Sequence, residues 1–170
     1  MTNIIPVDTK LDLVLKRELN VPVSLVWRGL TEPELLKQWF CPKPWGVSDC
    51  RLDLRPGGEF YTVMRDPDGN EFPSTGCILE VISEKRLTWT STMVTDFRPA
   101  KPVSADDKEC ANISMTAIIS IEAIPEGTAY TAHVMHATPE QSKLHEEMGF
   151  SEGWGTTVKQ LEELLNQEIA

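Results

Sequence analysis

The sequence predicts an α+β domain in which a curved antiparallel β-sheet is covered by one long C-terminal helix. Apolar residues recur at helical spacing from residue 151 onward, namely Trp154, Val158, Leu161 and Leu165. Most of the preceding chain alternates between apolar and polar residues and is interrupted by turn residues, which is typical of antiparallel strands. A helix that follows such strands buries the open face of the sheet, and the space between the two layers is a natural cavity.

Period-two alternation predicts about seven strands. In the first, leucines alternate with polar residues, although Arg17 interrupts the apolar side near its end. The sequence DPDGN at residues 66–70 is a strong hairpin signal, and PEG at residues 125–127 turns the last hairpin. We expect strands at residues 11–19, 50–54, 60–64, 76–82, 86–93, 113–123 and 128–137.

Two short helices are expected directly after the first strand. The apolar residues of 23–30 predict the first of them, and Thr31 with Glu34 has the spacing of a capping box that opens the second, at about 32–39. A second capping-box pattern, Thr138 with Gln141, predicts a further short helix that Gly149 ends before the long closing helix.

Composition and charge narrow the classes of function. The chain has 170 residues, 41% of them hydrophobic and 25% charged, which is typical of one globular domain. Its net charge of −10 disfavours nucleic acid and anionic membrane surfaces as partners. No basic, apolar leader opens the sequence and no run is long enough to span a bilayer, so we expect a cytoplasmic protein without membrane insertion.

The cysteines and histidines do not predict a metal site. The four cysteines have wide, irregular spacings that fit a reducing compartment, and none forms a C-x-x-C pair. His133 and His136 are three residues apart on a predicted strand, so they are expected to point to opposite faces. No catalytic motif of high specificity is present, and Gly57-Gly58 is interpreted as a turn between strands. We therefore predict no metal, no cofactor and no catalytic residue.

Several short motifs together resemble one known family. They are TEPELLKQWF at 31–40, DLRPGGEFYTVM at 53–64, DPDG at 66–69, GCILEVISEKRLTWT at 76–90, the threonine that opens the last strand, and GFSEGW at 149–154. In this order and spacing the chain resembles the activator-of-heat-shock-protein-90-ATPase-homologue-like branch of the START/Bet v 1-like (SRPBCC) superfamily. The resemblance covers about residues 11–166 of a single domain at 1–170.

The resemblance implies the helix-grip fold, in which the sheet wraps round the long C-terminal helix and encloses a hydrophobic cavity. It does not imply one reaction, because the superfamily includes lipid carriers, hormone receptors, cyclases and co-chaperone domains. Two segments depart from the simplest family pattern, namely the acidic, proline-containing loop at 97–108 and the segment 139–148. In a helix-grip fold both lie near the cavity mouth, where they either set ligand access or are neutral surface variation.

Aromatic and methionine side chains on the predicted inner surface are the candidate ligand contacts. Such side chains suit a flat or flexible apolar ligand, and plain core packing is the alternative for each of them. Trp154 lies between two glycines and is interpreted first as a packing anchor. The candidates are Trp39, Phe60, Met64, Trp89, Met93, Tyr130, Ala132, Val134, Trp154, Thr157 and Val158.

The sequence does not decide to which face of the sheet Glu80 and His133 point. Alternation around Glu80 does not decide its side, and an outward, solvated carboxylate is the favoured reading because unpaired buried carboxylates are rare. If Tyr130, Ala132 and Val134 face the cavity, then His133 points away to solvent; the other register places it inside, as an enzyme would need.

The leading hypothesis is a cytoplasmic protein that binds a small apolar or amphipathic molecule between the sheet and the closing helix. The alternatives are a co-chaperone-like module that contacts a chaperone, with a role in stress response, and a cyclase- or hydratase-type enzyme that uses polar cavity residues. An inward-facing pair of titratable groups would separate the enzyme from a carrier.

Overall fold

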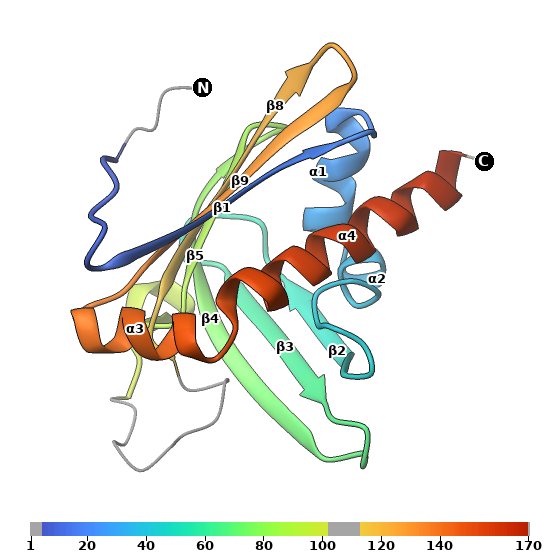
Figure 1. The fold of residues 1–170 in the computed structure, drawn as a ribbon. Helices are drawn as coiled ribbons and strands as arrows, with labels where there is room; N and C mark the ends of the chain where they lie inside the picture. The colour runs from blue at the N-terminus through green and yellow to red at the C-terminus, as the bar shows by residue number, and fades with distance from the viewer. Residues whose placement is uncertain (1–4, 102–112, 170) are drawn as a thin grey trace.

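The fold is an antiparallel sheet with helices on one face (Figure 1). The computed structural model describes residues 5–101 and 113–169. Seven strands form the main sheet in the order β1-β9-β8-β5-β4-β3-β2, so β1 and β2 are its edges. These strands are β1 (Asp12–Leu19), β2 (Gly46–Leu52), β3 (Glu59–Arg65), β4 (Glu71–Ile82), β5 (Arg86–Thr90), β8 (Thr116–Ile124) and β9 (Gly127–Met135).

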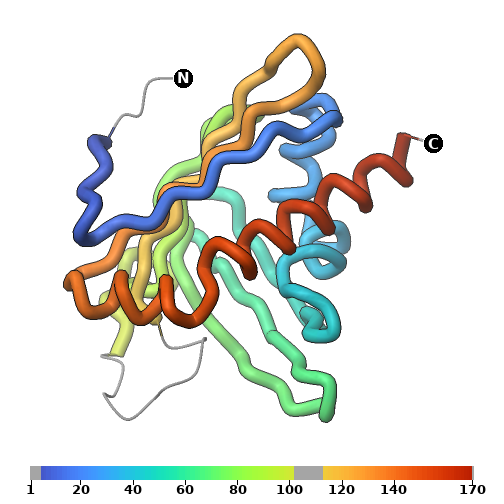
Figure 2. The backbone as a smooth tube through the Cα atoms, viewed as in Figure 1, coloured from blue at the N-terminus to red at the C-terminus, as the bar shows by residue number. Residues whose placement is uncertain are grey.

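A small hairpin and four α-helices complete the described structure. The hairpin consists of β6 (Met93–Val94), the 3₁₀ turn η1 (Thr95–Phe97) and β7 (Arg98–Pro99). The helices are α1 (Val23–Thr31), α2 (Pro33–Leu36), α3 (Pro139–Glu147) and α4 (Phe150–Ile169). Figures 1 and 2 show α4 running across the concave face of the sheet, with α3 at one end of it and α1 and α2 near the other.

This arrangement confirms the predicted helix-grip fold. Every pair of neighbouring strands in the main sheet is antiparallel, and the order of strands and helices follows the sequence-based expectation. Gly149 separates α3 from α4 as expected, because its φ of 93° lies in the left-handed region that favours glycine. Thr138 caps α3, and its side-chain oxygen accepts a hydrogen bond from the Gln141 amide at 3.2 Å.

The apolar stripe of α4 packs into the core as predicted. Val158, Leu161 and Leu165 are buried against the inner face of the sheet and against α1. On the sheet side the buried core includes Leu15, Ile119 and Leu87. The helix and the sheet therefore share one continuous core, which agrees with the economical use of an amphipathic helix inferred from the sequence.

Four expectations about local structure were wrong. The helix expected at 32–39 is only the short α2, and Thr31 does not cap it: its hydroxyl donates to the Trp27 carbonyl at 2.7 Å inside α1. The strand expected at 50–54 lies earlier, at Gly46–Leu52, and the strand expected at 76–82 begins at Glu71. The strand expected at 86–93 ends at Thr90, so Met93 belongs to the small hairpin. Of the loop expected at 97–108, residues 102–108 lie outside the described residues.

Within the described residues, no helix is both long enough and apolar enough to cross a membrane.

Candidate functional site

The candidate site is the space between the inner face of the sheet and the helices. Strand β9 presents Tyr130, Ala132 and Val134 to this side, and all three are buried beneath the helices. Burial raises the pKa of Tyr130 above its ordinary value, so the phenol stays protonated. On α4, Val158 and Thr157 are buried opposite them, and the Thr157 hydroxyl donates to the Trp154 carbonyl at 2.8 Å.

An aromatic wall forms the β3–β5 side of the space. The rings of Phe60 and Trp89 stack with centroids 4.6 Å apart and an interplanar angle of 11°. Gly76 on β4 pairs with Phe60 in the register, and a Cβ added there would lie 2.7 Å from the Thr90 carbonyl oxygen. Phe40 tilts against both rings, at 5.8 Å and 6.4 Å. This wall is rigid aromatic packing of the kind that lines apolar binding sites.

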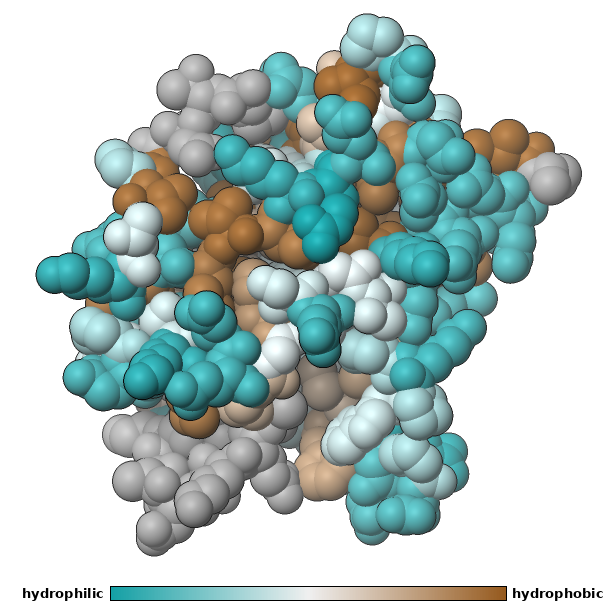
Figure 3. Space-filling model, viewed as in Figure 1, coloured by the Kyte–Doolittle hydropathy of each residue, from teal (hydrophilic) through white to brown (hydrophobic). Residues whose placement is uncertain are grey.

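Beyond the wall, the β2–β4 end of the inner face is less buried than the core. Val47, Met64 and Phe72 form one cross-strand row on β2, β3 and β4, and each is only half-buried. Trp45, which is 39% exposed, packs on Phe72 at 5.7 Å. Figure 3 shows a hollow below α4, beside the β3–β4 hairpin, with tan and brown side chains at its floor. An apolar surface of the sheet therefore remains partly open at this end.

The α3 end of the space is polar. His136 follows β9, and its Nδ1 lies 2.8 Å from the Leu11 carbonyl oxygen. Its Nε2 lies 2.9 Å from Nδ1 of His145 on α3. Both imidazoles are buried. Burial, and secondly the neighbouring His136, lower the pKa of His145 to about 4, so this side chain is neutral at pH 7.

Two aromatic residues at the start of α4 surround this polar end. The His145 ring is edge-on to Phe150 at 5.2 Å and to Trp154 at 6.3 Å, and the two aromatic rings lie 5.2 Å apart. Trp154 is half-buried, so it packs as an anchor and still presents part of its surface. Gly155, next to it, lies close to Arg17: an added Cβ would be 3.1 Å from the guanidinium.

Two other sequence candidates lie apart from this surface. Trp39 is buried in the core, where its indole N–H donates to the Gly29 carbonyl at 2.9 Å. Met93 lies on β6, outside the main sheet. The structure thus brings Phe60, Trp89 and the β9 residues to one inner face, whereas Trp39 serves packing and Met93 lies beside the sheet.

The opposite face of the sheet carries the two residues whose side the sequence left open. The Glu80 carboxylate accepts hydrogen bonds from Arg86 and Thr88, and the Arg86 contact is the main reason that the pKa of Glu80 is lowered. His133 also points away from the cavity, but it is buried rather than solvated. Its Nε2 lies 2.7 Å from Oδ2 of Asp12, which also accepts from the Asp8 amide at 2.9 Å.

His133 and His136 point to opposite faces, as their spacing predicts. The expectation of a solvated His133 was wrong because a neighbouring strand supplies a partner: β1 places Asp12 diagonally across from it. The buried Asp12 side chain is compensated by two hydrogen bonds, as buried polar groups require.

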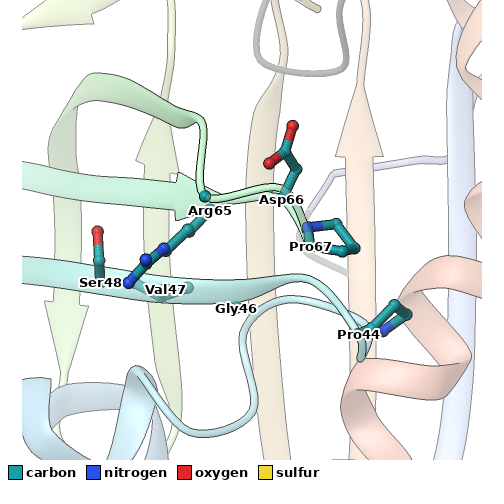
Figure 4. Close-up of a pocket in the computed structure, with 8 residues that line it drawn as sticks. Pro44, Gly46, Val47, Ser48, Arg65, Asp66 and Pro67 are labelled. Carbon is teal, nitrogen blue, oxygen red and sulfur yellow. The ribbon is translucent and has the colours of Figure 1, made fainter.

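A second, open pocket of about 350 Å³ lies at the end of the β2–β3 pair. Figure 4 shows the Arg65 side chain extending along β2 toward Ser48, whereas Asp66 points away from it. Asp66 is held by its own turn, since it accepts from the side chain and the backbone of Asn70. The remaining lining is mainly backbone, glycine and proline, so this pocket offers few side chains for recognition.

The cysteines that the structure describes do not form a reactive or metal-binding centre. Burial, and secondly Asp49, raise the pKa of the Cys50 thiol to about 11, which makes a thiolate rare at pH 7. Cys41 and Cys77 are also buried. Among residues 5–101 and 113–169, no three His, Cys, Asp or Glu side chains are grouped so that they would hold a metal ion.

Comparison with known families agrees with this architecture. The family model described as Activator of Hsp90 ATPase homolog 1-like protein matches residues 20–166. The chain belongs to this family. Among curated proteins, none matches the chain.

Solved structures of similar proteins share the fold. The crystal structure of protein NE0264 from Nitrosomonas europaea is 65% identical, with a TM-score of 0.88, and the match covers 96% of this chain and 99% of that one. The solution structure of an AHSA1-like protein from Aeromonas hydrophila is 18% identical, with a TM-score of 0.65 and coverage of 92% and 93%. A solution structure from Arthrobacter aurescens is 20% identical, with a TM-score of 0.76 and coverage of 97% and 93%.

Sequence reasoning missed several polar residues of the site. His136 was noticed only for its face, and His145 only as part of a charged segment before the closing helix. One signal was available: period two along β9 places residue 136 on the same face as Val134. The partner on α3 carried no signal, because a nine-residue separation says nothing about contact until the chain is folded.

Proposed function

We propose that this protein binds a small apolar or amphipathic molecule between the inner face of the sheet and α4. The observation that carries this proposal is the half-buried apolar row Val47, Met64 and Phe72, which continues the aromatic wall across β2, β3 and β4. Apolar surface that stays open beside a closed core is typical of a ligand site. Ligand binding is also common among proteins with this family's fold.

The start of α4 offers a position at which to block the proposed site. Gly153 lies three residues after buried Phe150 and four before buried Thr157, so helical spacing places it on the side that faces the sheet. A Cβ added at Gly153 meets nothing within 4 Å. Gly153→Phe therefore adds a ring next to the proposed site without a clash at Cβ. Ser151→Phe adds the same ring at an exposed position of the same turn and is the matched control.

The test is equilibrium dialysis of the protein against 2-methylnaphthalene. We expect saturable binding at one site per chain, unchanged by Ser151→Phe and weakened about tenfold or more by Gly153→Phe, because loss of a well-formed pocket contact of 1.4 kcal/mol is a factor of about ten. The proposal is wrong if the unmodified protein shows no saturable binding, or if both variants bind as it does. Near-ultraviolet circular dichroism of each variant checks that the core packing is retained.

An enzyme of the cyclase or hydratase type is less well supported. The pair His136 and His145 faces inward, as such an enzyme would need. However, a general base works best when its pKa is near the operating pH, and the pKa of His145 is about 4. This side chain is therefore better suited to accept a hydrogen bond than to remove a proton. The alternative of a chaperone contact stays a prediction.

A further inference from the structure

The hydrogen bonds at the α3 end of the site fix the tautomers of both histidines. A carbonyl oxygen only accepts, so the Leu11 carbonyl requires the proton of His136 to be on Nδ1. In the neutral ring Nε2 is then an acceptor, and Nδ1 of His145 must donate to it. Nε2 of neutral His145 is consequently left with a lone pair and no proton.

This lone pair has no partner within the described part of the chain. A second unpaired acceptor lies one helical turn earlier: Oε1 of Gln141 is buried and makes no hydrogen bond with any described residue. Residues four apart are neighbours on one face of a helix, so both acceptors lie on the same side of α3. A buried acceptor without a donor, such as this Gln141 oxygen, costs free energy, and such a group in a native protein calls for an explanation.

The apolar surroundings of these acceptors indicate what kind of molecule would supply the donor. His145 lies edge-on to Phe150 and to half-buried Trp154, which are part of the proposed site. We propose that the α3 end of the site binds the hydroxyl group of an otherwise apolar ligand, such as a phenol or an alcohol, whose single proton is shared between Nε2 of His145 and Oε1 of Gln141 in a three-centre hydrogen bond. This inference rests on the proposed function and specifies its ligand class.

The charges around this end of the site favour a neutral donor. Two acceptors repel a carboxylate or phosphate, and an ammonium group buried here would need an anionic partner. The charged groups of α3, namely Glu140, Lys143, Glu146 and Glu147, are all exposed. His145 itself stays uncharged at pH 7. A hydroxyl group donates without bringing a charge into this environment.

The test compares two probes of similar shape, 2-naphthol and 2-methylnaphthalene, which differ in a hydroxyl and a methyl group. Their affinities are measured by equilibrium dialysis for the unmodified protein, Gln141→Leu, His145→Phe and the control Gln167→Leu, which replaces an exposed glutamine of α4. For each protein, the affinity for 2-naphthol is divided by the affinity for 2-methylnaphthalene. The greater hydrophobicity of the methyl compound affects this ratio equally in all variants, so it drops out when the variants are compared.

We expect each site variant to reduce the preference for 2-naphthol by about threefold, because it removes one of two acceptors that share a single hydrogen bond, whose full worth is about three- to tenfold. Binding of 2-methylnaphthalene should be retained, and Gln167→Leu should change neither affinity. An unchanged ratio in both site variants overturns the inference but leaves the proposed function standing. Absence of saturable binding for both probes overturns the two together.

A second measurement uses the unmodified protein and therefore needs no amino-acid substitution. In ¹⁵N–¹H correlation spectra of the imidazoles, 2-naphthol should shift the Nε2 resonance of His145 upfield, because a ring nitrogen that accepts a hydrogen bond becomes more shielded. Saturating 2-methylnaphthalene should leave this resonance near its free position. Equal shifts with both probes would show that the hydroxyl is not bound at this nitrogen.

Discussion

The contact between α1 and α4 predicts that the effect of Gly29→Ala on stability changes sign with the residue at position 161. Gly29 of α1 lies against Leu161 of α4: a Cβ added at Gly29 would be 2.6 Å from the Leu161 Cδ1. Non-bonded carbon atoms normally approach to about 3.5–4.0 Å, so Gly29→Ala forces a displacement of about 1 Å in a buried contact. Overpacking of this kind costs about 1–3 kcal/mol. The better helix propensity of alanine offsets at most about 1 kcal/mol of this.

Substitution of Leu161 by alanine removes side-chain atoms from the contact that Gly29→Ala would overpack. Leu161 is 0% exposed, so Leu161→Ala should lower the free energy of unfolding by about 2–5 kcal/mol. It also removes the Cδ1 atom that Gly29→Ala would strike. In the Leu161→Ala background, Gly29→Ala should therefore become stabilising by about 0.5–1 kcal/mol, through helix propensity.

The assay is a double-mutant cycle measured by urea unfolding. The double variant should be more stable than the sum of the single effects by about 2 kcal/mol, which exceeds the few tenths expected of independent sites. Controls at exposed positions of α4, Lys159→Ala and Glu163→Ala, should change stability by less than about 0.5 kcal/mol. Additive effects within 0.5 kcal/mol, or comparable losses at the control positions, would show that α1 and α4 do not pack as described.

Three further outcomes follow from named contacts. Because the pKa of His145 is lowered to about 4, only the unfolded state gains this proton between about pH 6.5 and 4, so stability falls as the pH falls through that window. His145→Phe should remove on the order of 2 kcal/mol of that pH dependence, measured as the difference between urea-unfolding curves at pH 7 and 4.5. Trp39→Phe deletes the buried hydrogen bond to the Gly29 carbonyl and should cost about 1–3 kcal/mol in urea unfolding; no change would mean that the carbonyl finds another donor. Asp12→Ala removes the buried hydrogen-bond partner of His133 and should cost about 1–3 kcal/mol by thermal unfolding, whereas unchanged stability would contradict a close pair.

Local patterns in the sequence determined the architecture. The stripe from Trp154 to Leu165 predicts one helix and its buried face, and period two predicts the strands and the faces of most of their side chains. These predictions succeed because helical and strand geometry repeat over a few residues, so burial of one face appears directly in the order of the residues. The turn at Gly149 and the cap at Thr138 were recognisable for the same reason.

Local patterns failed where a side chain bonds to a partner other than the one that its spacing suggests. Thr31 has the spacing of a capping box, but its hydroxyl bonds within α1 because α2 begins with Pro33 after an extended Glu32. His133 faces away from the cavity as its register requires, yet it is buried, because β1 brings Asp12 to it from 121 positions earlier in the chain.

The polar end of the site was decided entirely by the tertiary structure. The Leu11 carbonyl lies just before β1, His136 just after β9 and His145 on α3, and only their contact in the folded chain determines which nitrogen carries a proton. The sequence determines that a histidine is present at each position. The tautomers of both histidines, the lowered pKa of His145 and its free lone pair depend on burial and on neighbours that are distant in sequence. Desolvation and hydrogen bonding are properties of the folded environment.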